Sequence, residues 1–233
     1  MQLPHQLPLD LETPDRFSRD QFITTPALQA VLDVLLAPEK WLSAHLILLG
    51  PAGSGKTHIG HIFAGMHDAC FLNASETQSL DPADIRDTTY VIDDAEEASE
   101  EILFHLNNRV QISGHHLVLM TNKHPLDWRP SLPDLASRLN ATRLLVLPEP
   151  DEDLLTAILN KLFAQRAISP SPDCIDYLAR RMDRSVTAAQ KIVTDIEHYA
   201  NGRAFNRALA RDFIDRAESL PPPDIDNARF DSF

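Results

Sequence analysis

The segment Gly50–Thr57 carries the clearest chemistry in this 233-residue chain. Its sequence, GPAGSGKT, satisfies the pattern G-x-x-x-x-G-K-S/T of a phosphate-binding loop, or P-loop. Glycines let successive backbone N–H groups point at phosphate oxygens, and the apolar residues 46–49 precede the loop as a buried strand would. We expect Lys56 to reach the β- and γ-phosphates and the Thr57 hydroxyl to bind Mg²⁺. The residues predicted to contact a nucleotide are Pro51, Ala52, Gly53, Ser54, Gly55, Lys56, Thr57 and His58.

Two aspartates, Asp93 and Asp94, follow a second apolar run, residues 89–92. Beside a P-loop, the first carboxylate would hold Mg²⁺ through its water shell, and the second would orient an attacking water. Asn122 follows another apolar run and is expected to hold that water or the γ-phosphate. Aspartate and asparagine are also common turn formers, so the three residues alone fit a purely structural interpretation as well. The P-loop upstream favours the catalytic interpretation.

Arg138 lies in the segment LPDLASRL, residues 132–139. A guanidinium on a short helix can enter a neighbouring subunit's site and stabilise charge during phosphoryl transfer. Such an arginine accelerates the reaction by about 10³–10⁵ in other systems. The other interpretation is an i,i+4 ion pair with Asp134, which would contribute roughly a few tenths of a kcal/mol. The residues alone leave both interpretations open.

Apolar runs alternate with amphipathic stretches over residues 17–150 and predict an α/β domain. Continuous apolar runs are typical of strands buried on both faces, so we expect a five-stranded parallel sheet between helices. The expected strands are residues 46–49, 70–72, 89–92, 117–120 and 144–147. From there on only helical periodicity remains, which predicts a small all-helical lid over residues 151–219. An N-terminal arm, residues 1–16, and a proline-rich tail, residues 220–233, flank the two domains.

The composition narrows the choice of partner and compartment. A formal net charge of −13 disfavours a protein whose main task is to bind a phosphate backbone, although a local basic patch stays open. We therefore expect a protein partner and no sequence-specific DNA binding. No run approaches the roughly 18 apolar residues of a membrane span, and no secretory leader opens the chain, so no membrane association is expected. Cys70 and Cys174 lie far apart and fit reduced thiols in the cytoplasm.

Taken together, the P-loop, the paired aspartates, Asn122, Arg138 and a helical lid resemble the AAA+ ATPases. More narrowly, the segments LPDLASRL and RMDR, residues 132–139 and 181–184, are similar to those of the Hda-type regulatory inactivators of the replication initiator DnaA. The resemblance extends from about Phe17 to Ala217. It implies a P-loop NTPase AAA+ core followed by the lid.

The N-terminal arm carries a second likeness. The peptide QLPLDL, residues 6–11, is similar to the Q-L-x-L-x-L peptide with which replication proteins bind the DNA polymerase sliding clamp. An extended peptide of this kind can insert its leucines into an apolar groove while the glutamine hydrogen-bonds at the rim. A leucine-rich arm without a partner would look the same, but its place before an AAA+ core favours clamp binding. The clamp-binding residues implied are Gln6, Leu7, Leu9 and Leu11.

The family resemblance also implies a function. In that family the clamp-bound protein presents its arginine to ATP held by DnaA, and hydrolysis of that ATP limits re-initiation of chromosome replication. Carried over, Arg138 is the arginine that acts in trans. The chain's own site is expected to hold ADP or ATP, with Mg²⁺ at Thr57 and Asp93 and with Asp94 and Asn122 beside it. Its own ATPase activity is expected to be weak or absent, and a homodimer stays open.

Four more residues concern the same nucleotide. Phe22 and Ile23 match the segment that packs near adenine in the family. Many AAA+ proteins carry a nucleotide-sensing arginine in the third lid helix; the aligned residue here is Thr187, and Arg184, one turn earlier, is the candidate to replace it. Two other functions stay open: a helicase-loader-like AAA+ ATPase acting on single-stranded DNA, and a non-catalytic adaptor that retains ADP.

Overall fold

The computed structural model describes residues 22–219, with side chains described as far as Ala217. The predicted clamp-binding peptide, the rest of the arm and the proline-rich tail lie outside these residues. The chain divides into two compact units, Met1–Pro148 and Glu149–Phe233. The described part of the first unit is α/β, and that of the second is helical throughout.

The first unit is built on a five-stranded sheet with the strand order β2-β3-β4-β1-β5. All four strand pairings are parallel, so the predicted parallel α/β fold is confirmed. The strands are β1 (His45–Leu49), β2 (Cys70–Asn73), β3 (Tyr90–Asp93), β4 (Leu117–Thr121) and β5 (Arg143–Val146). β3 ends one residue later than the sequence predicts, which makes Asp93 the last residue of the strand.

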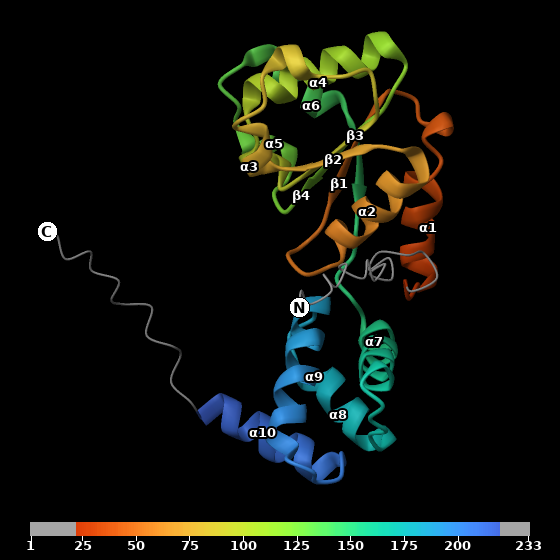
Figure 1. The fold of residues 1–233 in the computed structure, drawn as a ribbon, viewed down its shortest axis with the longest axis vertical. Coiled ribbons are helices and arrows are strands. Elements are labelled where there is room, and N and C mark those ends of the chain that lie inside the picture. The colour runs from red at the N-terminus through yellow and green to blue at the C-terminus, as the bar shows by residue number, and fades with distance from the viewer. Residues whose placement is uncertain (1–21, 220–233) are drawn as a thin grey trace, which may run out of the picture. The chain divides into compact units, whose positions relative to one another are not determined.

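Helices cover both faces of the sheet (Figure 1). The helices of this unit are α1 (Pro26–Leu35), α2 (Lys56–His67), α3 (Ala74–Thr77), α4 (Glu100–Ser113), α5 (Pro125–Trp128) and α6 (Pro133–Ala141), with 3-10 turns η2 (Pro38–Lys40), η3 (Pro82–Asp84) and η4 (Ala95–Glu97). Figure 1 shows α4 and α6 together on one side of the sheet and α1 with α2 on the other. The sheet therefore separates α4 and α6 from α1 and α2.

The core explains why the apolar runs become central strands. Ile47 of β1 and Leu119 of β4 are buried against Leu106 of α4 and Leu139 of α6. Each fully buried leucine or isoleucine contributes about 1.5–3 kcal/mol relative to an exposed one. This packing fixes α4 against α6, and it therefore decides which side chains of the two helices meet.

Helix α2 approaches the sheet closely at Gly60. A Cβ at this position would lie 2.6 Å from both the Sδ and the Cε atom of Met120 and 3.0 Å from a ring carbon of Phe71. Gly65 on the same helix has no such neighbour within 4 Å. The glycine at position 60 is thus required by packing, because α2 must lie against β4 to bring the P-loop to the edge of the sheet.

The second unit is a helical cluster, as predicted. It contains α7 (Glu152–Gln165), α8 (Pro172–Arg181), α9 (Val186–Ala200) and α10 (Arg207–Ser219). Asp151 and Ser185 cap α7 and α9 with side-chain oxygens that accept hydrogen bonds from Leu154 N and Ala188 N. Phe163 lies in the core of this unit. Among the described residues, no helix has the length and apolar character that crossing a membrane requires.

Candidate nucleotide-binding site

The P-loop connects the end of β1 to the start of α2 in a conformation that only glycine adopts readily. Gly53 and Gly55 have φ angles of 72° and 99°. At Gly50, a Cβ would lie 3.0 Å from the Cβ of Leu147 and 3.0 Å from Ser54 Oγ. The conformation of the loop therefore depends on glycine at these positions, and its binding of phosphate stays a prediction.

Lys56 begins α2, and its buried side chain folds back over the loop. Its ammonium nitrogen donates to the carbonyl oxygens of Gly50 at 2.7 Å and Pro51 at 2.9 Å, and to Asn122 Oδ1 at 2.7 Å. An ammonium group has three protons, so these three acceptors use all of them. A phosphate bound here would have to replace at least one of these partners.

Thr57 and Asp93 form the predicted magnesium pair. The Thr57 hydroxyl donates to Asp93 Oδ2 at 2.7 Å. Among residues 22–217, no group of three or more histidine, cysteine or acidic side chains is arranged to hold a metal ion. Mg²⁺ usually takes one or two protein carboxylates and completes its shell with water and phosphate oxygens. A hydroxyl and a carboxylate in contact fit that requirement, and Mg²⁺ here would neutralise phosphate charge.

Asp94 and Asn122 meet at the same edge of the sheet. Asn122 Nδ2 donates to Asp94 Oδ1 at 3.2 Å. Asp94 has a φ angle of 51°, in the left-handed region, which aspartate tolerates better than most residues. The two residues predicted to handle the attacking water are therefore brought together, although their catalytic role stays a prediction.

Glu96 belongs to this group as well, and the sequence did not single it out. Its Oε1 accepts a hydrogen bond from the backbone N–H of Asn122 at 3.0 Å, while its buried Oε2 has no hydrogen-bond partner among the described residues. Burial lowers the pKa of Lys56, and the carboxylates of Asp93, Asp94 and Glu96 oppose that effect. The signal in the sequence was the acidic run DDAEE, residues 93–97, in which no residue stands out.

The predicted adenine segment also lies beside the P-loop helix. The ring of Phe22 lies 5.1 Å from the imidazole of His58 in the first turn of α2, with the rings tilted by 52°. Ile23 is half-buried next to it. Ser54 Oγ is buried and has no hydrogen-bond partner within residues 22–217. An unsatisfied hydroxyl inside the loop is consistent with a ligand that accepts from it.

Arg138 has partners of its own, away from this group. Its NH1 nitrogen donates to Asn107 Oδ1 at 3.0 Å and Asn108 Oδ1 at 2.5 Å, and its NH2 nitrogen lies 2.9 Å from Asp134 Oδ2. The guanidinium carbon also lies 5.4 Å from the centre of the Phe104 ring. The i,i+4 ion pair considered from the sequence is therefore present, but it is one of four contacts.

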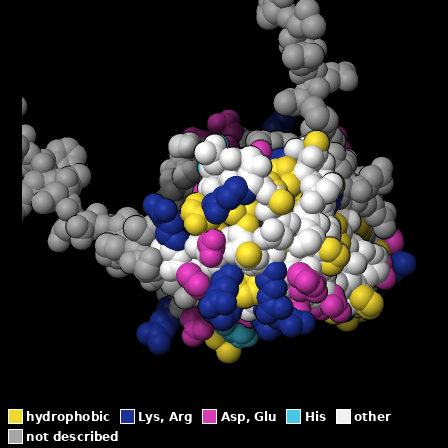
Figure 2. Space-filling view, turned by 90° about the horizontal axis from the view of Figure 1, so that it is seen from below, with side chains coloured by type: hydrophobic (Ala, Val, Ile, Leu, Met, Phe, Trp, Pro, Cys, Tyr) yellow, Lys and Arg dark blue, Asp and Glu magenta, His cyan; other side chains and the backbone are white. Residues whose placement is uncertain are grey.

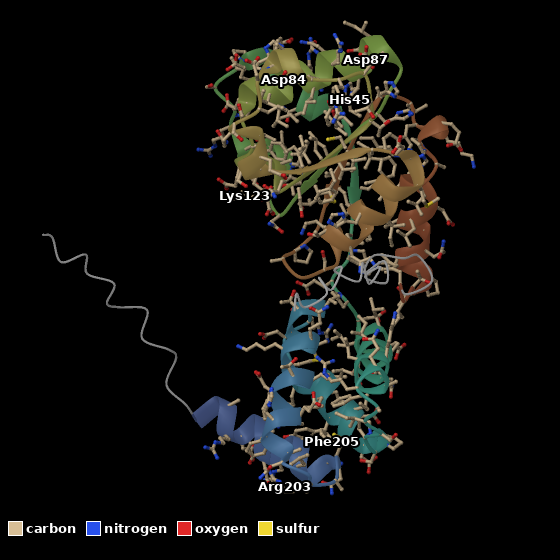
Figure 3. All side chains as sticks on the ribbon, in the orientation of Figure 1. His45, Asp84, Asp87, Lys123, Arg203 and Phe205 are labelled. Carbon is tan, nitrogen blue, oxygen red and sulfur yellow. The ribbon has the colours of Figure 1, made fainter. Side chains whose placement is uncertain are left out.

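These contacts place Arg138 at the opposite edge of the sheet from the P-loop. His45 Nε2 lies 3.1 Å from the backbone oxygen of Asn107, and His45 is the first residue of β1, whereas the P-loop follows its last residue, Leu49. Five residues of strand span about 13 Å. Figure 3 marks the two edges by His45 and by Lys123, which follows β4. Arg138 therefore cannot serve the nucleotide of its own chain.

The two lid residues named from the sequence lie in the second unit. Arg184 is exposed in the turn between α8 and α9, and Thr187 is exposed in the first turn of α9. Their roles at a nucleotide stay predictions.

Solved structures with the same architecture include replication proteins. Domain III of the Thermotoga maritima replication initiation protein DnaA matches with a TM-score of 0.69 and 19% identity over 86% of this chain and 98% of that one. AMPPCP-bound DnaA from Aquifex aeolicus matches with a TM-score of 0.67 and 17% identity over 90% and 70% of the two chains. This chain has the same fold as DnaA domain III. The Thermotoga maritima RuvB Holliday junction branch migration motor shares it, with a TM-score of 0.65 and 17% identity over 86% and 72%.

The sequence comparisons add no closer relative. No protein-family model matches the chain, and no curated protein matches it. At identities below 20%, the structural matches establish the fold of the chain, and its activity has to be argued from its own residues.

Proposed function

We propose that this chain is a regulatory AAA+ protein that binds the sliding clamp and supplies Arg138 to ATP held by a DnaA initiator. The observation that carries the proposal is the separation of Arg138 from the P-loop across the sheet, because an arginine at the far edge can reach only another molecule's nucleotide. Stimulated hydrolysis on the initiator would limit re-initiation of replication.

The chain's own site supports binding of ADP or ATP with Mg²⁺. The loop glycines, Lys56 and the Thr57–Asp93 pair have the arrangement that phosphate oxygens and one divalent cation require. The side chain of Asp94 is shorter than that of a glutamate and reaches less far toward an attacking water. We therefore propose that hydrolysis at this site is slow. The nucleotide would then act mainly as a bound ligand that stabilises the fold.

The charge distribution favours a protein partner over DNA. The chain carries 34 acidic and 21 basic residues. Figure 2 shows lysine and arginine side chains interspersed with aspartate and glutamate on the face seen from below. Binding to a phosphate backbone depends on an excess of positive charge, which the chain as a whole does not carry.

The test is ATP hydrolysis by purified DnaA of the same organism, with this protein and with the sliding clamp loaded on DNA. Wild type should stimulate hydrolysis, and Arg138→Ala should reduce the stimulated rate by about 10³-fold or to the initiator's own rate. Arg86→Ala removes another arginine from the same unit, an exposed one, and serves as the matched control. Full stimulation by a folded Arg138→Ala protein would contradict the proposal.

Clamp binding is tested separately, because Gln6 and Leu9 lie outside the described residues. Replacing both by alanine should abolish capture of the protein by immobilised clamp while leaving its nucleotide affinity unchanged. Unchanged capture would show that the arm is not the contact.

The two other functions give different results in the same assays. A helicase-loader-like ATPase would hydrolyse ATP without DnaA and bind single-stranded DNA at moderate salt. An adaptor that only retains ADP would act on the initiator without any contribution from Arg138.

A further inference from the structure

The guanidinium of Arg138 is held on one side by two neutral amides. We propose that Asn107 and Asn108 are positioning residues, which fix Arg138 through its NH1 nitrogen and leave its charge and its remaining N–H groups for a phosphate of the partner's nucleotide. This inference rests on the function proposed above. It assigns a role to two residues of α4 that the sequence motif around Arg138 does not include.

The count of hydrogen-bond donors supports this division of the guanidinium. Arginine has five N–H donors in a planar fork. Asn107 and Asn108 accept both hydrogens of NH1, and the carboxylate of Asp134 forms an ion pair with NH2 at 2.9 Å. Within residues 22–217, no group accepts from Nε of Arg138, and the side chain keeps 32% of its surface exposed. At least two donors therefore remain for an external anion, on a side chain that is already oriented.

The burial of Asn107 supports a role of its side-chain amide in binding Arg138. Asn107 is 2% exposed, and an amide buried without a hydrogen bond is destabilising. Arg138 is the one side chain that bonds to the Asn107 amide among the described residues. The backbone oxygen of Asn107 is in turn hydrogen-bonded to His45, which joins this residue of α4 to the start of β1. Asn107 therefore binds Arg138 from a buried position of α4 and not from the exposed surface of the helix.

Neutral acceptors have a specific advantage at this position. Carboxylates in place of Asn107 and Asn108 would orient Arg138 equally well but would cancel its charge. Asp134, its one ionic partner among the described residues, keeps 60% of its side-chain surface exposed. An exposed ion pair is weak, so a triphosphate can replace Asp134 at little cost. Arg138 is therefore oriented without losing its attraction for an anion.

Two substitutions with opposite charge effects test the inference in the full-length protein. Asn108→Asp adds a negative charge at the guanidinium and should reduce the stimulated ATP hydrolysis of the initiator about tenfold. Asp134→Asn removes the ionic competitor and should raise stimulation about twofold to fivefold at subsaturating protein. The matched controls, Gln190→Glu and Asp195→Asn, make the same charge changes at exposed positions of α9 and should leave stimulation unchanged.

A second measurement needs no partner. Burial is the main cause that lowers the pKa of His45, and the positive charge of Arg138 lowers it further, so the imidazole responds to the charge at this site. By NMR titration, the pKa of His45 should rise in Asn108→Asp and fall in Asp134→Asn, and thermal unfolding should show both variants folded. A His45 pKa that does not respond to Asn108→Asp would overturn the assignment.

The outcomes separate the two proposals. If Arg138→Ala abolishes stimulation while Asn108→Asp and Asp134→Asn leave it unchanged, the positioning role is wrong and the proposed function stands. If Arg138→Ala retains stimulation, the proposed function is wrong, and the inference falls with it.

Discussion

The ammonium nitrogen of Lys56 and the amide oxygen of Asn122 lie 2.7 Å apart, across 66 positions of sequence. This hydrogen bond joins the P-loop to the residue that follows β4. Because a phosphate would compete for the same ammonium group, nucleotide binding is expected to change the partner of Asn122. The two loops are therefore coupled through one proton of Lys56.

Lys56→Met should weaken nucleotide binding. The substitution removes a charge-assisted contact to phosphate that contributes about 1.5–3 kcal/mol, so the Kd for ADP should rise about 10- to 100-fold. Isothermal titration calorimetry with Mg²⁺ present checks the value. Lys40→Met, at an exposed lysine of η2, is the control, and an equal affinity for Lys56→Met and wild type would show that the P-loop does not hold a phosphate.

Two glycines of α2 should respond to alanine in opposite directions. Gly60→Ala introduces a Cβ 2.6 Å from Met120 Sδ and should lower the free energy of unfolding by about 1–3 kcal/mol. Gly65→Ala meets nothing within 4 Å and should raise it by about 0.5–1 kcal/mol, because alanine favours the helix. Urea unfolding of both variants measures the difference. Similar effects for the two would mean that α2 does not lie close to β4.

Two histidines should make the fold less stable in mild acid. Burial lowers the pKa of His45 and His116 below the ordinary value of 6.5, so the unfolded chain binds protons more readily than the folded one. Their contribution to stability is complete above pH 6.5 and is lost as the pH falls through 6.5 toward the folded-state values. Urea unfolding at pH 7.5 and 5.5 should show a decrease. The double variant His45→Gln, His116→Gln should show a smaller one, and a protein more stable at pH 5.5 would refute the assignment.

The two cysteines should differ in reactivity. Burial raises the pKa of the Cys174 thiol to about 11, and the side chain has no exposed surface. Only the thiolate is nucleophilic, so at pH 8 a Cys70→Ser protein should react with a disulfide reagent at least about 100-fold more slowly in the native state than in urea. Cys70, which is half-buried, should be the residue modified in the native wild type. Fast native labelling of Cys174 would show that the helical unit opens readily.

Local patterns predicted the sheet and the P-loop because both depend on neighbouring residues. Strands buried on both faces need continuous apolar runs, and the runs at residues 46–49 and 117–120 became β1 and β4. The loop needs glycine at fixed spacing, which the motif contains. The short helices α3 and α5 were missed, because four residues are too few to show a helical period.

The partners of Arg138 could not be predicted, since they depend on how α4 packs against α6. The sequence showed the pair with Asp134, four residues away, whereas Asn107 and Asn108 lie 31 and 30 positions away. Glu96 was missed for a similar reason. The left-handed turn at Asp94 and η4 decide which carboxylates of the acidic run contact Asn122, and neither feature can be recognised from composition.

The P-loop and Arg138 lie at opposite ends of β1, so the first unit has two different ends, one with a nucleotide site and one with an arginine. With a nucleotide site at one end and an arginine at the other, copies can contact one another head to tail, so that each arginine meets the nucleotide site of the next copy. An open row of such contacts leaves one arginine and one nucleotide site uncovered at its ends. Under the function proposed above, one copy of this protein would bind at the end of such a row, present Arg138 to the last nucleotide there, and leave the order of the other subunits unchanged.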